Sequence, residues 1–200
     1  PGGNTAQTEK YDGSSWTEVN DLNTARINLA GAGTQTSALA FGGGPPVKNE
    51  TEKFDGTSWT EVNNLNTARQ VLAGTGTQTA ALAFGGEITA NSASAESFNG
   101  TSWTEIAALN SARYALGGAG TTTSALAFGG DNPRTAITES WNGSAWSEVA
   151  DLNTARYALA GTGSSNTSAL AIGGNLDPGL SALNESYNGT SWSEVADLNT

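Results

Sequence analysis

LAGAGTQTSALAFGGGPPVKNETEKFDGTSWTEVNNL, residues 29–65, is one copy of a unit that the 200-residue chain repeats almost four and a half times. A tryptophan near the end of each copy marks the period, and it recurs at Trp16, Trp59, Trp103, Trp146 and Trp192. The steps between these tryptophans are 43, 44, 43 and 46 residues. A period of this length predicts stacked repeats, in which each copy buries its apolar faces against its neighbours.

Four strands are expected in each copy. Residues 29–33 are small, which suits a strand near a crowded central axis, and residues 38–41 form an apolar run that ends at a glycine pair. Such a run predicts a strand buried on both faces, with leucine and phenylalanine on one face and alanines on the other. Residues 51–54 predict a half-buried strand, the Asp-Gly pair that follows predicts a tight hairpin, and residues 58–62 suit an outermost strand.

Antiparallel strands, short turns and a glycine-rich inner strand predict an all-β chain, a β-propeller of about four and a half four-stranded blades. We expect one repeat domain over residues 1–200, made of an outer half-blade at 1–22 and blades at 23–65, 66–109, 110–152 and 153–200. The chain begins at Pro1 and contains no methionine, which indicates a piece of a longer polypeptide. The half-blade supplies only its two outer strands. Either truncation of the chain or completion of this blade by another molecule would account for the two inner strands that it lacks.

The copies resemble kelch repeats, in which a glycine pair, a Glu and an aromatic residue, a Trp and an Arg follow one another. The glycine pairs begin at Gly42, Gly85, Gly129 and Gly173, and the Glu residues are Glu9, Glu52, Glu96, Glu139 and Glu185. The low divergence among copies is similar to that of repeats in virion and surface proteins of phages and bacteria. The resemblance implies kelch-like blades, and it favours an extracellular or virion-surface location.

Composition narrows the classes of function. The chain has no histidine and no cysteine, which removes the commonest general base, the commonest zinc ligand and disulfides. Its formal net charge of −11 disfavours nucleic acid and anionic membrane surfaces as partners. No apolar run approaches the ~20 residues that cross a bilayer. Identical carboxylates spread around a perimeter do not converge as a catalytic pair must. We therefore expect no enzyme activity, no metal and no cofactor.

Two sets of residues are candidates for ligand binding. One arginine per copy recurs on the link between blades, where it would either join a ring of cations at a pocket mouth or brace the recurring Glu; the repetition of both partners favours the brace. The segments after the glycine pairs differ in length and chemistry on an otherwise copied scaffold, as specificity loops do. The candidate residues are Arg26, Arg69, Arg113, Arg156, Lys48, Asn49, Asn132, Arg134, Tyr114 and Tyr157.

Two hypotheses of function follow. The first is a recognition module that binds a protein or a glycan through the variable loops and the arginine-bearing links. The second is a structural subunit that completes its half-blade with a neighbouring chain, giving a homo-oligomer or a filament, because an incomplete blade leaves an adhesive edge. The repeated tryptophans are expected to pack between blades rather than to form a sugar-binding ring.

Overall fold

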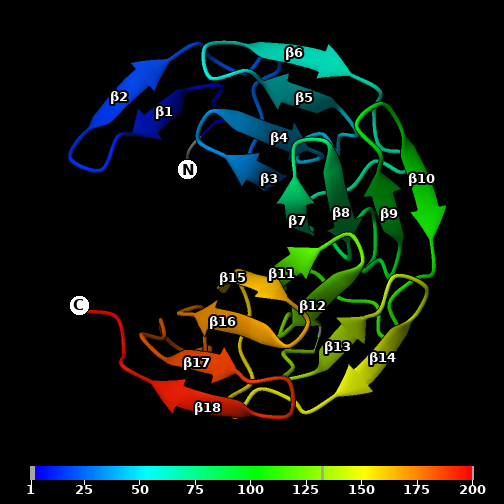
Figure 1. The fold of residues 1–200 in the computed structure, drawn as a ribbon, viewed down its shortest axis with the longest axis vertical. Coiled ribbons are helices and arrows are strands. Elements are labelled where there is room, and N and C mark those ends of the chain that lie inside the picture. The colour runs from blue at the N-terminus through cyan, green and yellow to red at the C-terminus, as the bar shows by residue number, and fades with distance from the viewer. Residues whose placement is uncertain (1–2, 132, 200) are drawn as a thin grey trace.

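The computed structural model describes residues 3–131 and 133–199, and in this part of the chain all regular structure is β. Four four-stranded antiparallel sheets and one two-stranded sheet follow each other around a centre as the blades of a β-propeller, which confirms the predicted fold class (Figure 1). The described residues contain no helix that could span a membrane. The arc is open between the first hairpin and the last blade (Figure 1).

Each sheet is formed by consecutive strands of the chain. The first strand of every blade lies at the centre of the arc and the fourth lies at the outside (Figure 1). The half-blade is β1 (Thr8–Tyr11) and β2 (Trp16–Val19). The blades are β3 (Ala30–Thr34), β4 (Ser37–Phe41), β5 (Thr51–Phe54) and β6 (Trp59–Val62); β7 (Ala73–Thr77), β8 (Ala80–Phe84), β9 (Ala95–Phe98) and β10 (Trp103–Ile106); β11 (Gly117–Thr121), β12 (Ser124–Phe128), β13 (Thr138–Trp141) and β14 (Trp146–Val149); and β15 (Ala160–Ser165), β16 (Ser168–Ile172), β17 (Asn184–Tyr187) and β18 (Trp192–Val195).

The blades stack by fitting bulky side chains of one sheet onto small residues of the next. Leu39 and Phe41 on β4 share a buried cluster with Ala81 and Ala83 on β8, as the alternation of the second strand predicts. The Phe41 ring also lies over Gly74 on β7, where an added Cβ would come within 2.5 Å of the ring. Glycine at the centre thus lets the phenyl ring approach the neighbouring backbone, and it is the reason that the inner strands are nearly free of side chains.

The motif tryptophans pack between blades where a preceding blade is present. Trp103, on β10, lies 4.9 Å from the ring of Phe41 in the preceding blade, and its indole N–H donates to the Thr51 hydroxyl at 3.0 Å. Trp146 and Trp192 occupy the same place and are also buried. Trp16 is 66% exposed, contrary to the prediction, because no described blade precedes the half-blade.

Two local predictions differ from the structure. The strand β5 is more buried than the sequence suggested, since Thr51, Glu52 and Phe54 are all enclosed by neighbouring strands. The hairpin predicted at Asp55-Gly56 is present, but it is looser than the tight turn expected: four residues, 55–58, connect Phe54 to its partner Trp59. The Asp55 carboxylate closes this loop by accepting the backbone N–H of Thr57 and Ser58, each at 2.8 Å. These bonds, that of Ser58 foremost, lower the pKa of Asp55.

Candidate ligand-binding rim

The links between blades and the variable loops lie on the same rim. Isolated antiparallel bridges join each link to the start of the variable loop in the same blade, pairing Ile27 with Gly44, Gln70 with Glu87, Tyr114 with Asp131 and Tyr157 with Asn175. The shared rim was predicted from the direction of the strands, and these bridges confirm it. We call these eight residues the bridge row, since they recur blade after blade on a common backbone frame.

Backbone hydrogen bonds between neighbouring blades hold the links in place. The Val71 N–H donates to Asn28 O at 2.8 Å, Ala115 to Val71 at 2.9 Å and Ala158 to Ala115 at 2.8 Å. All four residues have positive φ, between 52° and 56°. This conformation is uncommon outside glycine, above all for a β-branched residue such as valine, and it persists only where the surrounding contacts enforce it. The links are therefore rigid supports for the loops beside them.

The four recurring arginines lie inside this rim and brace it. The Arg26 guanidinium is 2.6 Å from Glu52, that of Arg69 is 2.9 Å from Glu96, and all four pairs are buried. Arg113 pairs with Glu139 and Arg156 with Glu185 in the same way. A guanidinium enclosed by its carboxylate and by loop carbonyls has no face left for a ligand. The alternative in which these arginines form a ring of cations at a pocket mouth is thus wrong. The geometry supports the other role, in which each arginine braces the blade by pairing with its glutamate.

A polar patch spans the second and third blades in the bridge row. The Tyr114 hydroxyl donates to the Asp131 carboxylate at 3.1 Å, and the Gln70 amide donates to the Glu87 carboxylate at 2.8 Å. Burial raises the pKa of Tyr114, and the hydrogen bond to Asp131 and the charges of Asp131 and Glu87 raise it further. Tyr157 lies near enough to contribute to the same effect. The bridge row thus carries two half-buried tyrosine rings, one of them bonded to a carboxylate through its hydroxyl, and an amide–carboxylate pair in the preceding blade.

The other predicted binding residues have different surroundings. Lys48 forms an ion pair with Glu50 at 3.4 Å, and the Asn49 side chain donates to Leu65 O at 3.0 Å, so Asn49 serves the scaffold. Arg134 is exposed, and its guanidinium donates to Asp177 O in the next variable loop at 3.1 Å. The candidate Asn132 lies outside the described residues. Of this group, Arg134 and Lys48 present side chains at the rim.

A small pocket opens between the third variable loop and its link. It has a volume of about 190 Å³ and is lined by Ser111, Ala112, Arg113, Pro133, Thr135 and Ile137. Its lining is mostly apolar, and the Arg113 that borders it is held by Glu139. The pocket therefore offers a ligand apolar surface and no free charge. It could serve as an apolar subsite beside the polar patch.

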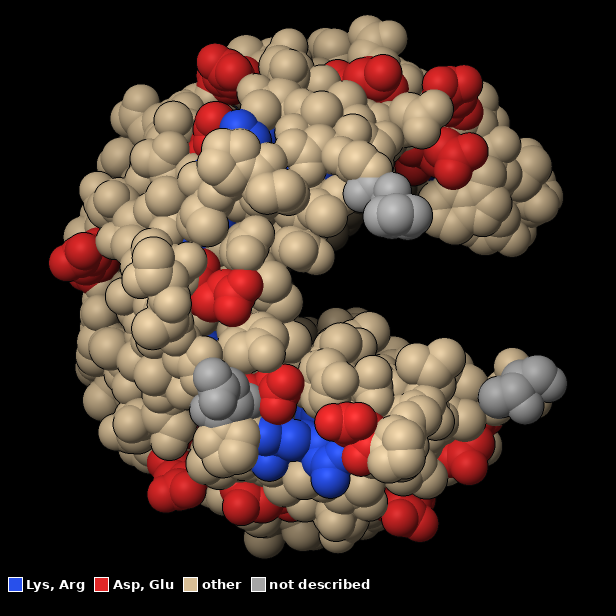
Figure 2. Space-filling view, turned by 180° about the vertical axis from the view of Figure 1, so that it is seen from behind, with Lys and Arg blue, Asp and Glu red and all other residues tan. Residues whose placement is uncertain are grey.

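Charge is distributed unevenly over the molecule. Figure 2 shows acidic side chains along the arc, whereas basic side chains are prominent in only two places on that face. Among residues 3–131 and 133–199, no three His, Cys, Asp or Glu side chains gather in a way that could hold a metal ion. Between the glycine pairs and the third strands the charged residues are four acids, Glu50, Glu87, Asp131 and Asp177, and two cations, Lys48 and Arg134. The rim is therefore acidic, which suits neutral or basic ligand surfaces better than polyanions.

Sequence reasoning missed Gln70 and Glu87. They stand at the positions that Tyr114 and Asp131 occupy one blade later, so aligning the copies would have placed them in the same row. No protein-family model matches the sequence, and no curated protein matches it.

Proposed function

We propose that the chain is a non-enzymatic recognition module of a virion or cell surface, built from kelch-like blades, that binds a protein or a glycan at the rim of variable loops. The observation that carries the proposal is the bridge row: it sets loops of different length and chemistry side by side on a nearly identical, rigid frame. Specificity is commonly placed in this way, on loops held by a rigid scaffold.

The chemistry of the rim supports a neutral or basic ligand. Tyr114 and Tyr157 offer aromatic rings, and Asp131, Glu87 and Gln70 offer acceptors and donors in the same row. Aromatic rings beside hydroxyl, amide and carboxylate groups bind apolar and polar parts of a ligand together. A sugar or a polar protein surface has this mixture.

The test is binding to an array of glycans and to surface proteins, followed by exchange of loops. Replacing residues 131–135 with the loop 87–91, and separately altering 44–49, should abolish or redirect binding. The matched control changes a turn at the opposite end of the strands, Asp55→Asn, which copies the residue found in three other units. Binding that survives both loop changes contradicts the proposal, and clear turnover in a broad hydrolase screen contradicts the absence of enzyme activity.

A second candidate function is self-assembly, in which chains associate end to end through the incomplete unit into oligomers or filaments. Tyr11 is 44% exposed and Trp16 66%, whereas Tyr187 and Trp192 at the same places in the last blade are 4% and 5% exposed. At the other end of the arc, Leu170 and Ile172 are only half-buried, although their counterparts in the interior blades are fully covered. These two faces would fit as adjacent blades do. Sedimentation that shows a monomer at high concentration would exclude this candidate.

A further inference from the structure

The hairpins between the third and fourth strands of the blades, with that of the half-blade, form a matched series of loops. Each loop begins with an aspartate or an asparagine followed by glycine, at Asp12, Asp55, Asn99, Asn142 and Asn188. In every loop the side-chain oxygen Oδ1 accepts the backbone N–H of the second and of the third residue that follow, at 2.8 to 3.0 Å. The three asparagines are exposed, so water reaches their side-chain amides.

These two N–H donors also polarise the asparagine amide toward attack at its carbon, Cγ. A nucleophile that adds to Cγ pushes negative charge onto Oδ1, and N–H groups already held at that oxygen stabilise such a charge. The backbone nitrogen of the next residue, Gly100 in the second blade, can act as this nucleophile, because its attack on Asn99 closes a five-membered ring. Within residues 3–131 and 133–199, the Gly100 N–H and the Asn99 side-chain NH₂ group donate to no acceptor. Glycine has no side chain to obstruct the approach of its nitrogen.

Two copies of the loop already contain the residue that such an attack would produce. Asp12 and Asp55 accept the same pair of N–H bonds as the asparagines do. The bonds from Ser58 and then Thr57 lower the pKa of Asp55, which means that the loop holds a carboxylate better than a neutral group. Conversion of an asparagine to aspartate would therefore keep the shape of the hairpin and strengthen its hydrogen bonds.

One of the asparagine loops has a cation bound to it. The Lys53 ammonium, on β5 of the first blade, donates to Gly100 O at 2.7 Å and lies 5.6 Å from the centre of the Phe98 ring. Because Gly100 O and Gly100 N belong to one residue, the ammonium is also within several ångströms of the nitrogen. A positive charge at that range favours the deprotonated, nucleophilic form of the N–H group. Ser140 holds the corresponding position in the third blade, which precedes the loop of Asn188 in the fourth.

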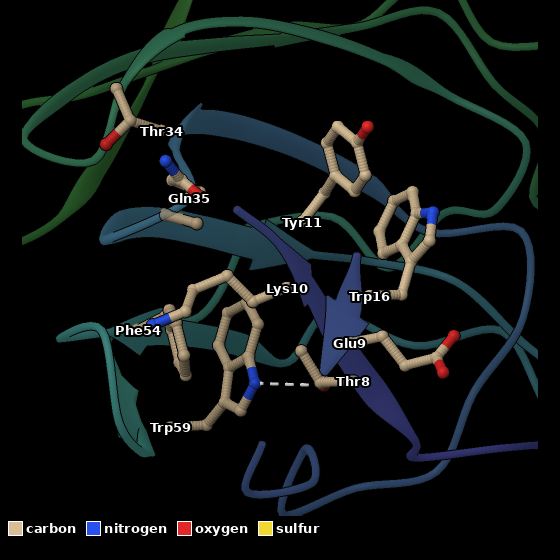
Figure 3. A pocket seen from close by; sticks show the side chains of 10 residues that line it. Thr8, Glu9, Lys10, Tyr11, Trp16, Thr34, Gln35, Phe54 and Trp59 are labelled. Carbon is tan, nitrogen blue, oxygen red and sulfur yellow. Dashed lines mark hydrogen bonds between the residues drawn. The ribbon is translucent and has the colours of Figure 1, made fainter. Parts of the chain in front are cut away.

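A lysine also accompanies the loop of the first blade. Figure 3 shows the Lys10 side chain, on β1, reaching toward Phe54, the residue that precedes the loop of Asp55. Lysine therefore accompanies the loops that begin at residues 55 and 99, whereas serine holds the corresponding positions for the later two loops. The series of loops thus separates the effect of the cation from that of the loop itself.

We propose that Asn99, Asn142 and Asn188 are sites of self-modification, at which each loop converts its own asparagine into aspartate, and that Lys53 makes Asn99 the fastest of the three. Water or hydroxide takes the glycine N–H proton, and the glycine nitrogen bonds to Cγ. The bond from Cγ to Nδ2 breaks as Nδ2 takes up a proton and leaves as ammonia, and a cyclic imide remains. Water then adds to the imide and returns a proton to the nitrogen: breaking the bond from the nitrogen to Cγ gives aspartate, and breaking the bond to the main-chain carbonyl gives isoaspartate.

The modification changes the charge of the molecule away from the ligand-binding rim. Each conversion adds one negative charge, so three conversions take the formal net charge from −11 to −14. The loops lie at the opposite end of the strands from the bridge row, and the inference is therefore independent of ligand binding.

The test follows the asparagines by peptide mapping and mass spectrometry during incubation at mildly alkaline pH, in the folded protein and in concentrated urea. Residues 99–103 and 188–192 have the same sequence, so Asn99 and Asn188 should react at equal rates in the unfolded chain. In the folded protein both should react at least as fast as in urea. Asn99 should then be about two- to fivefold faster than Asn188, which is the effect expected of one partly screened charge.

Two variants isolate the contribution of the cation. Lys53→Ser copies the residue found at position 140 and should slow Asn99 to the rate of Asn188 in the folded protein. Asp55→Asn creates the same five-residue sequence beside Lys10, and the new asparagine should react at the faster rate.

Three results would overturn the proposal. The first is conversion at these sites no faster than at exposed asparagines that no glycine follows. The second is slower conversion in the folded protein than in urea, because the loop would then protect the amide instead of activating it. The third is an equal rate for Asn99 and Asn188 in the folded protein, or an unchanged rate of Asn99 in the Lys53→Ser variant, either of which removes the role of the lysine.

Discussion

Replacing Glu96 by glutamine removes the counter-charge from a guanidinium that the fold has enclosed. The Glu96 carboxylate lies 2.9 Å from Arg69, and both side chains are fully buried. Burial lowers the pKa of Arg69, and the charge of Glu96 opposes that effect. The carboxylate also accepts the backbone N–H of Asn66 at 2.8 Å, which a glutamine oxygen can still accept. The same carboxylate also accepts the Asn66 side-chain amide and the Thr67 N–H, and the single oxygen of glutamine cannot serve all these donors. The substitution therefore strands a buried positive charge and leaves a buried N–H donor facing the new amide group.

Removing one partner of a buried ion pair costs about 3–5 kcal/mol. Domains are stable by only about 5–15 kcal/mol, so Glu96→Gln should remove a large part of the free energy of unfolding. The chain supplies its own control, because Glu9 occupies the same position in the half-blade but is exposed and has no arginine partner among the described residues. Glu9→Gln should change stability by about 0.5 kcal/mol or less, as surface substitutions do.

The assay is equilibrium unfolding in urea, followed by tryptophan fluorescence and by circular dichroism, since repeat arrays can unfold blade by blade. The double variant Arg69→Met with Glu96→Gln removes the stranded charge and should recover part of the loss. A loss below about 1 kcal/mol for Glu96→Gln would refute the brace as a stabilising contact. An equal loss for Glu9→Gln would show that the effect is not due to the buried pair.

Three further predictions use the same comparison between repeats. Gly118→Ala should lower the free energy of unfolding in urea by about 1–3 kcal/mol, because the added Cβ would lie 2.7 Å from a phenyl carbon. Gly31→Ala, where no ring lies nearby, should cost less than about 1 kcal/mol, and equal losses would contradict the role of the ring. Trp146→Ala should cost about 3–5 kcal/mol and Trp16→Ala far less, since their exposed fractions are 5% and 66%; thermal unfolding checks the order. Backbone N–H bonds, that of Ser15 foremost, lower the pKa of Asp12 from 3.8 to about 2, so the stability that its carboxylate contributes is present above pH 4 or so and is lost as pH falls through 2. NMR titration of Asp12 checks this value, and Asp12→Asn should remove the acid sensitivity of that hairpin.

Much of the fold follows from the repeated sequence. A run such as Ala38 to Phe41 predicts a strand buried on both faces whatever its neighbours are. The side chains on both faces are apolar and differ only in bulk. The pairing of a recurring Arg with a recurring Glu was also predictable, since both recur with the same period. The number of strands per blade follows from turn residues spaced along each copy.

The sequence was less informative about the site. It left two roles open for the arginines, because a cation on a link can face solvent or the interior, and only the wrapping of neighbouring strands decides which. It also missed Gln70 and Glu87, whose proximity to Tyr114 depends on how adjacent links are set beside each other. Contacts between units depend on geometry that no single copy contains.

The sequence by itself determined the blade, because the period, the alternation of side-chain size and the glycines act within one unit. The tertiary structure decided which of the repeated residues are buried. Trp16 and Trp146 stand in the same motif, yet Trp16 is exposed and Trp146 is buried. The physical reason is that burial belongs to a pair of neighbouring blades and not to the residue, so the same side chain is packed wherever a neighbour is present and open where none is.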